Sequence, residues 1–133
     1  GANALIKAVK QFEDGTYKLI PQDNSKATFT KMLTKDMCEI DFSLNAENVC
    51  NFIRGLNPWP VATTSILGEV IKVYSAKVVD LTGTAGEILS INSRDGFIIA
   101  CKNKAIQILT MQKVGGKVMS ADDFLRGYKP NKV

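Results

Sequence analysis

The stretch at residues 54–60, Arg-Gly-Leu-Asn-Pro-Trp-Pro, constrains the fold of this chain more than any other. Asn57 and Trp59 each precede a proline, and the clash with the proline ring pushes the preceding residue out of helical geometry and into extended geometry. A helix must therefore end here, and the chain must leave as an extended segment. Helical patterns occur before this stretch and strand-like runs follow it, so we predict a junction between a helical part and a β part.

The first helical pattern covers residues 2–12. Leu5, Ile6, Val9 and Phe12 recur at helical spacing, and the Asp-Gly pair at residues 14–15 favours an end to the helix. The apolar stripe begins at residue 2 without a capping residue. We therefore expect this sequence to begin inside a longer protein, with a helix whose apolar face has lost its partner domain. Such a face is expected to fold back on the rest of the chain or to allow self-association through residues 2–12.

A second, better marked helix is predicted just before the junction. Asn45 is a favourable N-cap, and Glu47 suits the positive start of a helix. Leu44 and Val49 occupy the two positions of a hydrophobic staple. Gly55 and the prolines then end the helix, which places it directly against the β part.

Five strand-like runs separated by turn-forming residues follow the junction. They are residues 61–67, 70–80, 86–91, 96–101 and 105–112. In the second run the apolar positions switch phase near Tyr74, which predicts a β-bulge. Five short strands in about fifty residues are too few for two packed sheets, so they favour a small closed barrel. Ser120 is expected to cap a short helix that ends at Gly127, and residues 128–133 are expected to form a loose tail.

The charge of the chain is concentrated in the β part. Basic and acidic residues balance over residues 1–60, so the net charge of +4 arises entirely from residues 61–133. A basic balance of this kind is a weak indication of a phosphate-rich partner, and the alternative is that the charge only provides solubility. The chain has no histidine, which removes the simplest acid–base catalytic designs.

The three cysteines and the hydropathy of the chain narrow the class further. Cys38, Cys50 and Cys101 form no closely spaced pair, and no histidine is present to complete a zinc site, so we predict reduced thiols and no metal. No apolar run approaches the roughly 20 residues needed to cross a bilayer. With no signal peptide recognisable at the N-terminus, we predict a cytoplasmic protein without membrane contact.

Several motifs resemble the methionyl-tRNA formyltransferase family. The run IRGLNPWP, preceded by EIDFSLNAENVCNF, is similar to that family's Arg-x-x-Asn-Pro-Trp-Pro junction, although Phe42 stands where tryptophan is usual. The later run LTMQKVGGKVMSADDFLRG resembles the end of the same enzymes. Residues 86–89 resemble the family's Pro-Gly-x-Ile strand, with Ala85 in place of the proline. The resemblance covers essentially the whole chain.

The resemblance implies three parts. Residues 1–42 would be the tail of the formyltransferase catalytic domain and the linker, residues 43–60 the junction helix with its Pro-Trp-Pro turn, and residues 61–133 a C-terminal barrel with a short terminal helix. The implied fold is mainly β with flanking helices, an OB-like small β-barrel preceded by a helical linker region.

The resemblance also implies a function for the parent protein. That family transfers a formyl group from 10-formyltetrahydrofolate to methionyl initiator tRNA, using an Asn–His–Asp set in an N-terminal catalytic domain. This chain lacks that region, so we expect it to be inactive alone and to hold no cofactor. Its expected partners are initiator methionyl-tRNA and the catalytic domain in cis.

The candidate site residues fall into two groups. Basic side chains expected to follow the phosphate backbone of tRNA are Lys72, Lys77, Arg94, Lys102, Lys104, Lys113 and Lys117. Residues expected to have structural roles at the junction are Arg54, Asn57, Pro58, Trp59 and Pro60. Arg54 is expected to be a clamp on the barrel, with a phosphate contact as the alternative, and Trp59 a packing anchor, with a base-stacking platform as the alternative.

Two other functions remain open at this point. The chain could be the equivalent domain of a formyltetrahydrofolate hydrolase/dehydrogenase or of a sugar-nucleotide formyltransferase, where no tRNA is bound. It could also be a general interaction domain. The basic bias of residues 61–133 and the intact GGKVM…FLRG ending favour the tRNA-binding module.

Overall fold

The computed structural model describes residues 1–127 and divides the chain into two compact units, Gly1–Met32 and Leu33–Val133. The boundaries expected after residues 42 and 60 do not coincide with this division. The segment from residue 33 to the junction belongs to the same unit as the strands because its apolar side chains enter the same core. The predicted tail at residues 128–133 lies outside the described part.

The first unit contains helix α1 (Ala2–Glu13) and a short 3₁₀ helix, η1 (Asn24–Lys26). The helix predicted at residues 2–12 is therefore confirmed, and Gly15, with φ of 68°, follows its end. The Phe12 ring stacks on Tyr17 with 4.5 Å between ring centroids. No residue of α1 is buried, and its apolar stripe is largely exposed. The expectation that this apolar stripe folds back on the rest of the chain or allows self-association stays a prediction.

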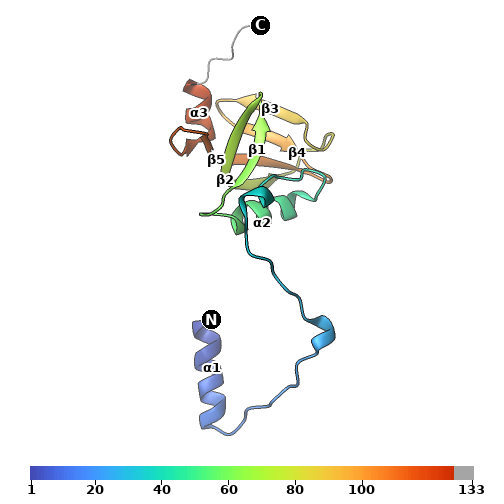
Figure 1. Cartoon of the computed structure of the whole chain (residues 1–133), viewed down its shortest axis with the longest axis vertical. Coiled ribbons are helices and arrows are strands. Elements are labelled where there is room, and N and C mark those ends of the chain that lie inside the picture. The colour runs from blue at the N-terminus through green and yellow to red at the C-terminus, as the bar shows by residue number, and fades with distance from the viewer. Residues whose placement is uncertain (128–133) are drawn as a thin grey trace. The chain divides into compact units, whose positions relative to one another are not determined.

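The second unit is a single antiparallel sheet with flanking helices (Figure 1). Its elements are η2 (Lys35–Met37), α2 (Ala46–Gly55), β1 (Ala62–Ile66), β2 (Glu69–Val79), β3 (Ile88–Asn92), β4 (Gly96–Ala100), β5 (Ala105–Lys113), β6 (Met119–Ser120) and α3 (Ala121–Gly127). The strand order is β1-β2-β5-β4-β3, and β6 pairs with β5. All five predicted strands are confirmed to within about two residues at each end.

The bulge predicted in the second strand is also present. The pairing of β2 with β5 shifts register between Val73 and Ser75 and shifts back between Ser75 and Ala76, so Tyr74 on β2 and Leu109 on β5 are each left out of the pairing. Val73 is fully buried before the bulge, whereas Ala76 and Val78 pack against the core after it. The bulge bends β2 so that both halves of this long strand can face one core, which gives the sheet its barrel-like curvature.

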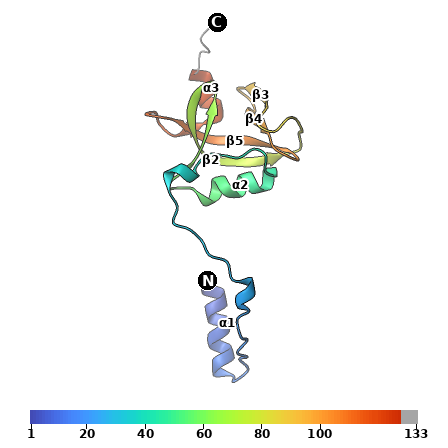
Figure 2. The ribbon, with the colours of Figure 1, turned by 45° about the vertical axis from the view of Figure 1, so that its right-hand side comes forward.

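Helices α2 and α3 lie on opposite sides of the strands (Figure 2). Val49 and Ile53 of α2 join the buried cluster formed by the strands. On the other side, the Phe124 ring of α3 lies 6.0 Å from that of Phe97, which is completely buried. The two helices therefore close the core of the barrel-like sheet. No helix within residues 1–127 is long and apolar enough to span a membrane.

The start of α2 is capped differently from the expectation. Asn45 lies at the N-cap position, but its side chain makes no capping hydrogen bond. Instead the Ala46 amide donates to Oδ1 of Asn103, at 2.9 Å, and the Asn103 amide donates to Glu47 at 3.2 Å. Asn103 belongs to the turn between β4 and β5, so a distant loop replaces the local cap. The expectation that the Asn45 side chain caps α2 is therefore wrong. It relied on residues next to the helix in the sequence, whereas the capping side chain comes from a loop far along the chain.

This arrangement predicts unequal effects for two asparagines. Asn103→Ala removes the acceptor for the helix start and is expected to lower the free energy of unfolding by about 1 kcal/mol. Asn45→Ala removes no capping bond and should change it by less than about 0.5 kcal/mol. Urea unfolding of both variants checks this, and a larger loss for Asn45→Ala would contradict the assignment.

Candidate nucleic-acid interface

The seven basic residues predicted to contact nucleic acid do not form one patch. Three of them lie near the start of β2 and the end of β5, where the β1–β2 and β5–β6 hairpins turn; we call this the hairpin end. They are Lys72, Lys113 and Lys117. Lys77, Lys102 and Lys104 lie toward the opposite end of the β2–β5 pair, and Arg94 is in the β3–β4 turn.

Lys72 occupies the outer face of the sheet. Its cross-strand neighbours are Thr63 on β1 and Gln112 on β5. The Gln112 amide is held in place because it accepts a hydrogen bond from the Tyr74 hydroxyl at 2.7 Å and donates one to the Gly116 carbonyl at 2.8 Å. Lys72 is half-buried, and no ion pair is found for it within residues 1–127. Lys72 therefore presents a positive charge without an ion-pair partner, between the polar side chains of Thr63 and Gln112 on the neighbouring strands.

The other two cations of the hairpin end differ in their pairing. Lys113 Nζ lies 2.6 Å from Oε1 of Glu69, so much of its charge is neutralised. Lys117 is exposed in the β5–β6 turn and has no ion-pair partner in the described range. A pocket of about 360 Å³ lies between this turn and α3, with Met119 and Phe124 in its wall beside both lysines. The hairpin end thus combines positive charge with apolar surface.

Of the remaining four candidates, only Lys104 has an ion-pair partner within residues 1–127, whereas Lys102 and Arg94 make hydrogen bonds through their backbone amides. The Lys104 ammonium lies 3.9 Å from Glu47 on α2, and the Lys102 amide donates to the Leu44 carbonyl at 3.1 Å. The backbone amide of Arg94 donates to Oδ1 of Asn92, which fixes the β3–β4 turn. Lys77 is exposed opposite Gln107. The turn that carries Lys102 and Lys104 therefore has a structural role at the start of α2.

Hydrogen bonds tie the junction turn to β2 and close it. The Asn57 amide donates to the Tyr74 carbonyl at 3.0 Å, so the turn is tied to the β2 bulge. Pro60 is buried, and both Asn57-Pro58 and Trp59-Pro60 are cis. The Val61 amide donates to the Leu56 carbonyl at 2.9 Å and closes the turn.

The expectation for Trp59 is wrong. Trp59 is not a packing anchor, because its side chain is 60% exposed. Leu56 and Pro60 point into the unit instead, so the residues between them face outward. The Arg54 guanidinium donates to Asn51 of its own helix at 2.6 Å, and its role as a clamp on the barrel stays a prediction. Arg54 also borders a pocket of about 180 Å³ beside the bulge.

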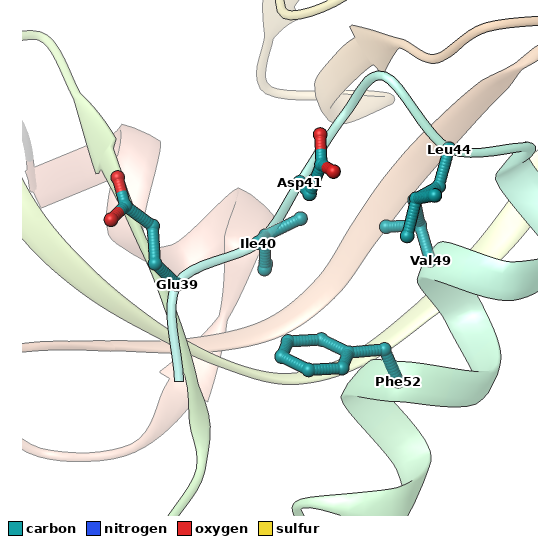
Figure 3. A pocket seen from close by; sticks show the side chains of 6 residues that line it. All are labelled: Glu39, Ile40, Asp41, Leu44, Val49 and Phe52. Carbon is teal, nitrogen blue, oxygen red and sulfur yellow. The ribbon is translucent and has the colours of Figure 1, made fainter. Parts of the chain in front are cut away.

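The other pockets and the cysteines offer little chemistry. A pocket of about 40 Å³ between residues 39–44 and α2 contains the predicted staple residues Leu44 and Val49, with Phe52 facing Ile40 (Figure 3). It is about the size of a few water molecules.

Burial raises the pKa of the Cys101 thiol to about 11, and burial also raises the pKa of the Cys50 thiol. A thiol with a raised pKa is a poor nucleophile. Residues 1–127 contain no cluster of potential metal ligands.

Sequence reasoning missed Thr63 and Gln112 as neighbours of Lys72. Both are uncharged, and only the strand register places them in one row. The alternation of inward and outward side chains along β1 and β5 does predict that Thr63 and Gln112 face outward. Their position beside Lys72 follows only from the order of the strands, in which β2 lies between β1 and β5.

Comparisons with known proteins agree with this domain. Residues 32–129 match the family model described as formyl transferase, C-terminal domain. The chain is 40% identical over 131 residues to a methionyl-tRNA formyltransferase of Carboxydothermus hydrogenoformans and 40% identical over 133 residues to one of Bacillus cereus, covering 98% of this chain in each case. It spans 42% of the length of each of these relatives.

A solved structure shares the fold. The crystal structure of HypX from Aquifex aeolicus in complex with tetrahydrofolic acid superposes on this chain with a TM-score of 0.60 at 19% sequence identity. The match covers 98% of this chain and 24% of the HypX chain. At this identity the likeness concerns the fold alone. The family match and the 40% identical relatives lead to one conclusion: this chain belongs to the formyl transferase C-terminal domain family.

Proposed function

We propose that this chain is the tRNA-binding C-terminal part of a methionyl-tRNA formyltransferase. The parent enzyme would transfer the formyl group of 10-formyltetrahydrofolate to the amino group of methionyl initiator tRNA, at the start of translation in the cytoplasm. The names of the 40% identical relatives support this assignment. The catalytic domain would act in cis, and the chain alone, without histidine, would not transfer the formyl group.

The observation that carries the tRNA-binding role is the charge at the hairpin end. Lys72 and Lys117 lack ion-pair partners within residues 1–127, and both belong to hairpins of the same sheet end. Each lysine that contacts a phosphate releases a counterion, so such contacts give affinity that depends on salt. They position a nucleic acid without reading its sequence. The choice of initiator tRNA would then fall to the catalytic domain.

Binding of the 133-residue chain to initiator tRNA at several salt concentrations tests the proposal. The double variant Lys72→Gln/Lys117→Gln should bind more weakly, and the slope of log K against log salt should become shallower by about 0.7–0.9 for each phosphate contact removed. Lys77→Gln/Lys102→Gln is the matched control, because it removes the same charge from the opposite end of the sheet. We expect the control to retain most of the wild-type slope.

The contrary outcomes separate the alternatives. Equal losses in both double variants would mean that net charge alone attracts the tRNA. Absence of binding even at low salt would contradict a tRNA-binding module and favour the small-molecule formyltransferases and formyltetrahydrofolate hydrolases as parents.

A further inference from the structure

Four aliphatic side chains are exposed at the hairpin end, and neither the fold nor the proposed phosphate contacts use them. They are Leu67, Val70, Val114 and Val118, with exposed fractions of 48%, 54%, 64% and 49%. We call them the apolar tip. Single exposed aliphatic residues are common on proteins, whereas a group on adjacent turns indicates an interaction surface.

The pairing of the strands brings the two turns together. Ile66 pairs with Glu69 across the β1–β2 hairpin, and Ile71 pairs with Lys113 at the end of β5. Continuing that register by one residue places Val114 opposite Val70. The ion pair between Glu69 and Lys113, at 2.6 Å, links the two hairpins directly. The two turns that carry the apolar tip therefore lie at the same end of the sheet, with Val70 and Val114 on neighbouring strands.

The backbone of Leu67 gives an independent reason to expect a use for this surface. Leu67 has φ of 53° and Gly68 has φ of 79°, so both residues of the β1–β2 turn lie in the left-handed region. Two-residue turns of this kind favour Asn-Gly, because asparagine tolerates that region better than a bulky apolar residue. Folding alone would therefore favour asparagine at residue 67. The sequence instead holds an exposed leucine in an unfavourable conformation, and such outliers often mark functional contacts.

The charges beside the apolar tip indicate the kind of partner. Lys72 and Lys117 are unpaired within the described range, and Glu69 is already bound to Lys113. A second copy of the chain docked on this surface would bring like charges together, which is unfavourable. A polyanion with apolar faces between its charges fits better. RNA meets this description, because its bases and riboses lie between phosphates.

We propose that the apolar tip packs against bases or riboses of the bound tRNA while Lys72 and Lys117 contact the adjacent phosphates. This inference rests on the proposed function and assigns a separate, salt-independent part of the affinity to aliphatic side chains. Aliphatic residues inserted beside bases are a known mode of nucleic-acid binding, and RNA offers unstacked bases in its loops.

Leu67→Asn tests this inference, alone and combined with Val114→Ser. The measurement is the affinity of the 133-residue chain for initiator tRNA at two salt concentrations. The double variant should bind about tenfold more weakly, with an unchanged salt slope, because contacts to bases release few counterions. The thermal midpoint of Leu67→Asn should not fall, since asparagine suits the turn. Leu81→Asn is the matched control, as Leu81 is 46% exposed in the loop between β2 and β3.

Three results would overturn the inference. If the double variant binds tRNA as tightly as the unaltered chain, the tip makes no contact with RNA. If Leu81→Asn weakens binding equally, the effect is not local to the tip. If the double variant only abolishes self-association in sedimentation experiments, the tip is a protein interface. Failure of the unaltered chain to bind tRNA would instead contradict the proposed function itself.

Discussion

Phe97→Ala is expected to lower the free energy of unfolding of the second unit by about 3–5 kcal/mol. Phe97 has no exposed surface, and it lies opposite Ile108 on β5 with its ring against Phe124 of α3. Truncation leaves a cavity between β4, β5 and α3. Because β4 is paired with β5 on one side and β3 on the other, its backbone cannot readily move to fill this cavity. Urea unfolding followed by circular dichroism measures the change.

The matched control is Ile91→Ala, which truncates an aliphatic residue directly opposite Phe97 on β3. Its side chain is 43% exposed, so the expected loss is about 1 kcal/mol or less. Equal losses for the two variants would contradict the placement of Phe97 at the centre of the core. If Phe97→Ala does not fold, Phe97→Leu provides a smaller change of the same sign.

Gly96→Ala is expected to cost about 2–5 kcal/mol, from two separate causes. Gly96 has φ of 67°, a conformation that disfavours any residue with a Cβ. An added Cβ would also lie 2.8 Å from the Ala121 Cβ and 3.3 Å from the Ile108 carbonyl oxygen. Helix α3 would have to move away from β4 to make room.

Gly115→Ala separates the two causes. Gly115 has φ of 78°, but an added Cβ would meet nothing within 4 Å. Gly115→Ala should therefore lower the free energy of unfolding by about 1–2 kcal/mol, from the backbone conformation alone. The difference between the two alanine variants, measured by urea unfolding, gives the steric contribution at Gly96. A difference near zero would mean that α3 does not pack tightly on β4.

The local features of the fold were predictable from the sequence. Turn residues and alternation located the five strands, and the phase switch near Tyr74 located the bulge. These signals are local, because a strand's two faces and a turn's backbone are decided by neighbouring residues. The Ser120 cap is another example, since the Asp123 amide donates to the Ser120 hydroxyl three residues away.

Features that depend on distant contacts were not predictable in the same way. Asn103 caps α2 from 57 residues away, so no local pattern could reveal it. Trp59 was expected to be buried because tryptophan is large and apolar, but the irregular turn at residues 56–61 buries Leu56 and Pro60 in its place. Likewise, the seven candidate cations could be named from the sequence, whereas strand register places three at each end of the β2–β5 pair and Arg94 in the β3–β4 turn.

The left-handed conformation of Leu67 also escaped sequence analysis. The strand runs predicted at residues 61–67 and 70–80 leave residues 68–69 for the turn, one residue later than the observed turn at Leu67-Gly68, because glycine is the residue that normally marks such a turn. Leucine gives no signal for positive φ.

Backbone amide chemical shifts of the ¹⁵N-labelled 133-residue chain, titrated with initiator tRNA, test most directly whether the hairpin end binds tRNA. We predict shifts or line broadening at residues 67–72 and 112–118, weakening as salt is raised. The β4–β5 turn at residues 102–104 should change little, because its side chains hold the start of α2. Changes confined to that turn and α2, or no changes at all at low salt, would contradict the account.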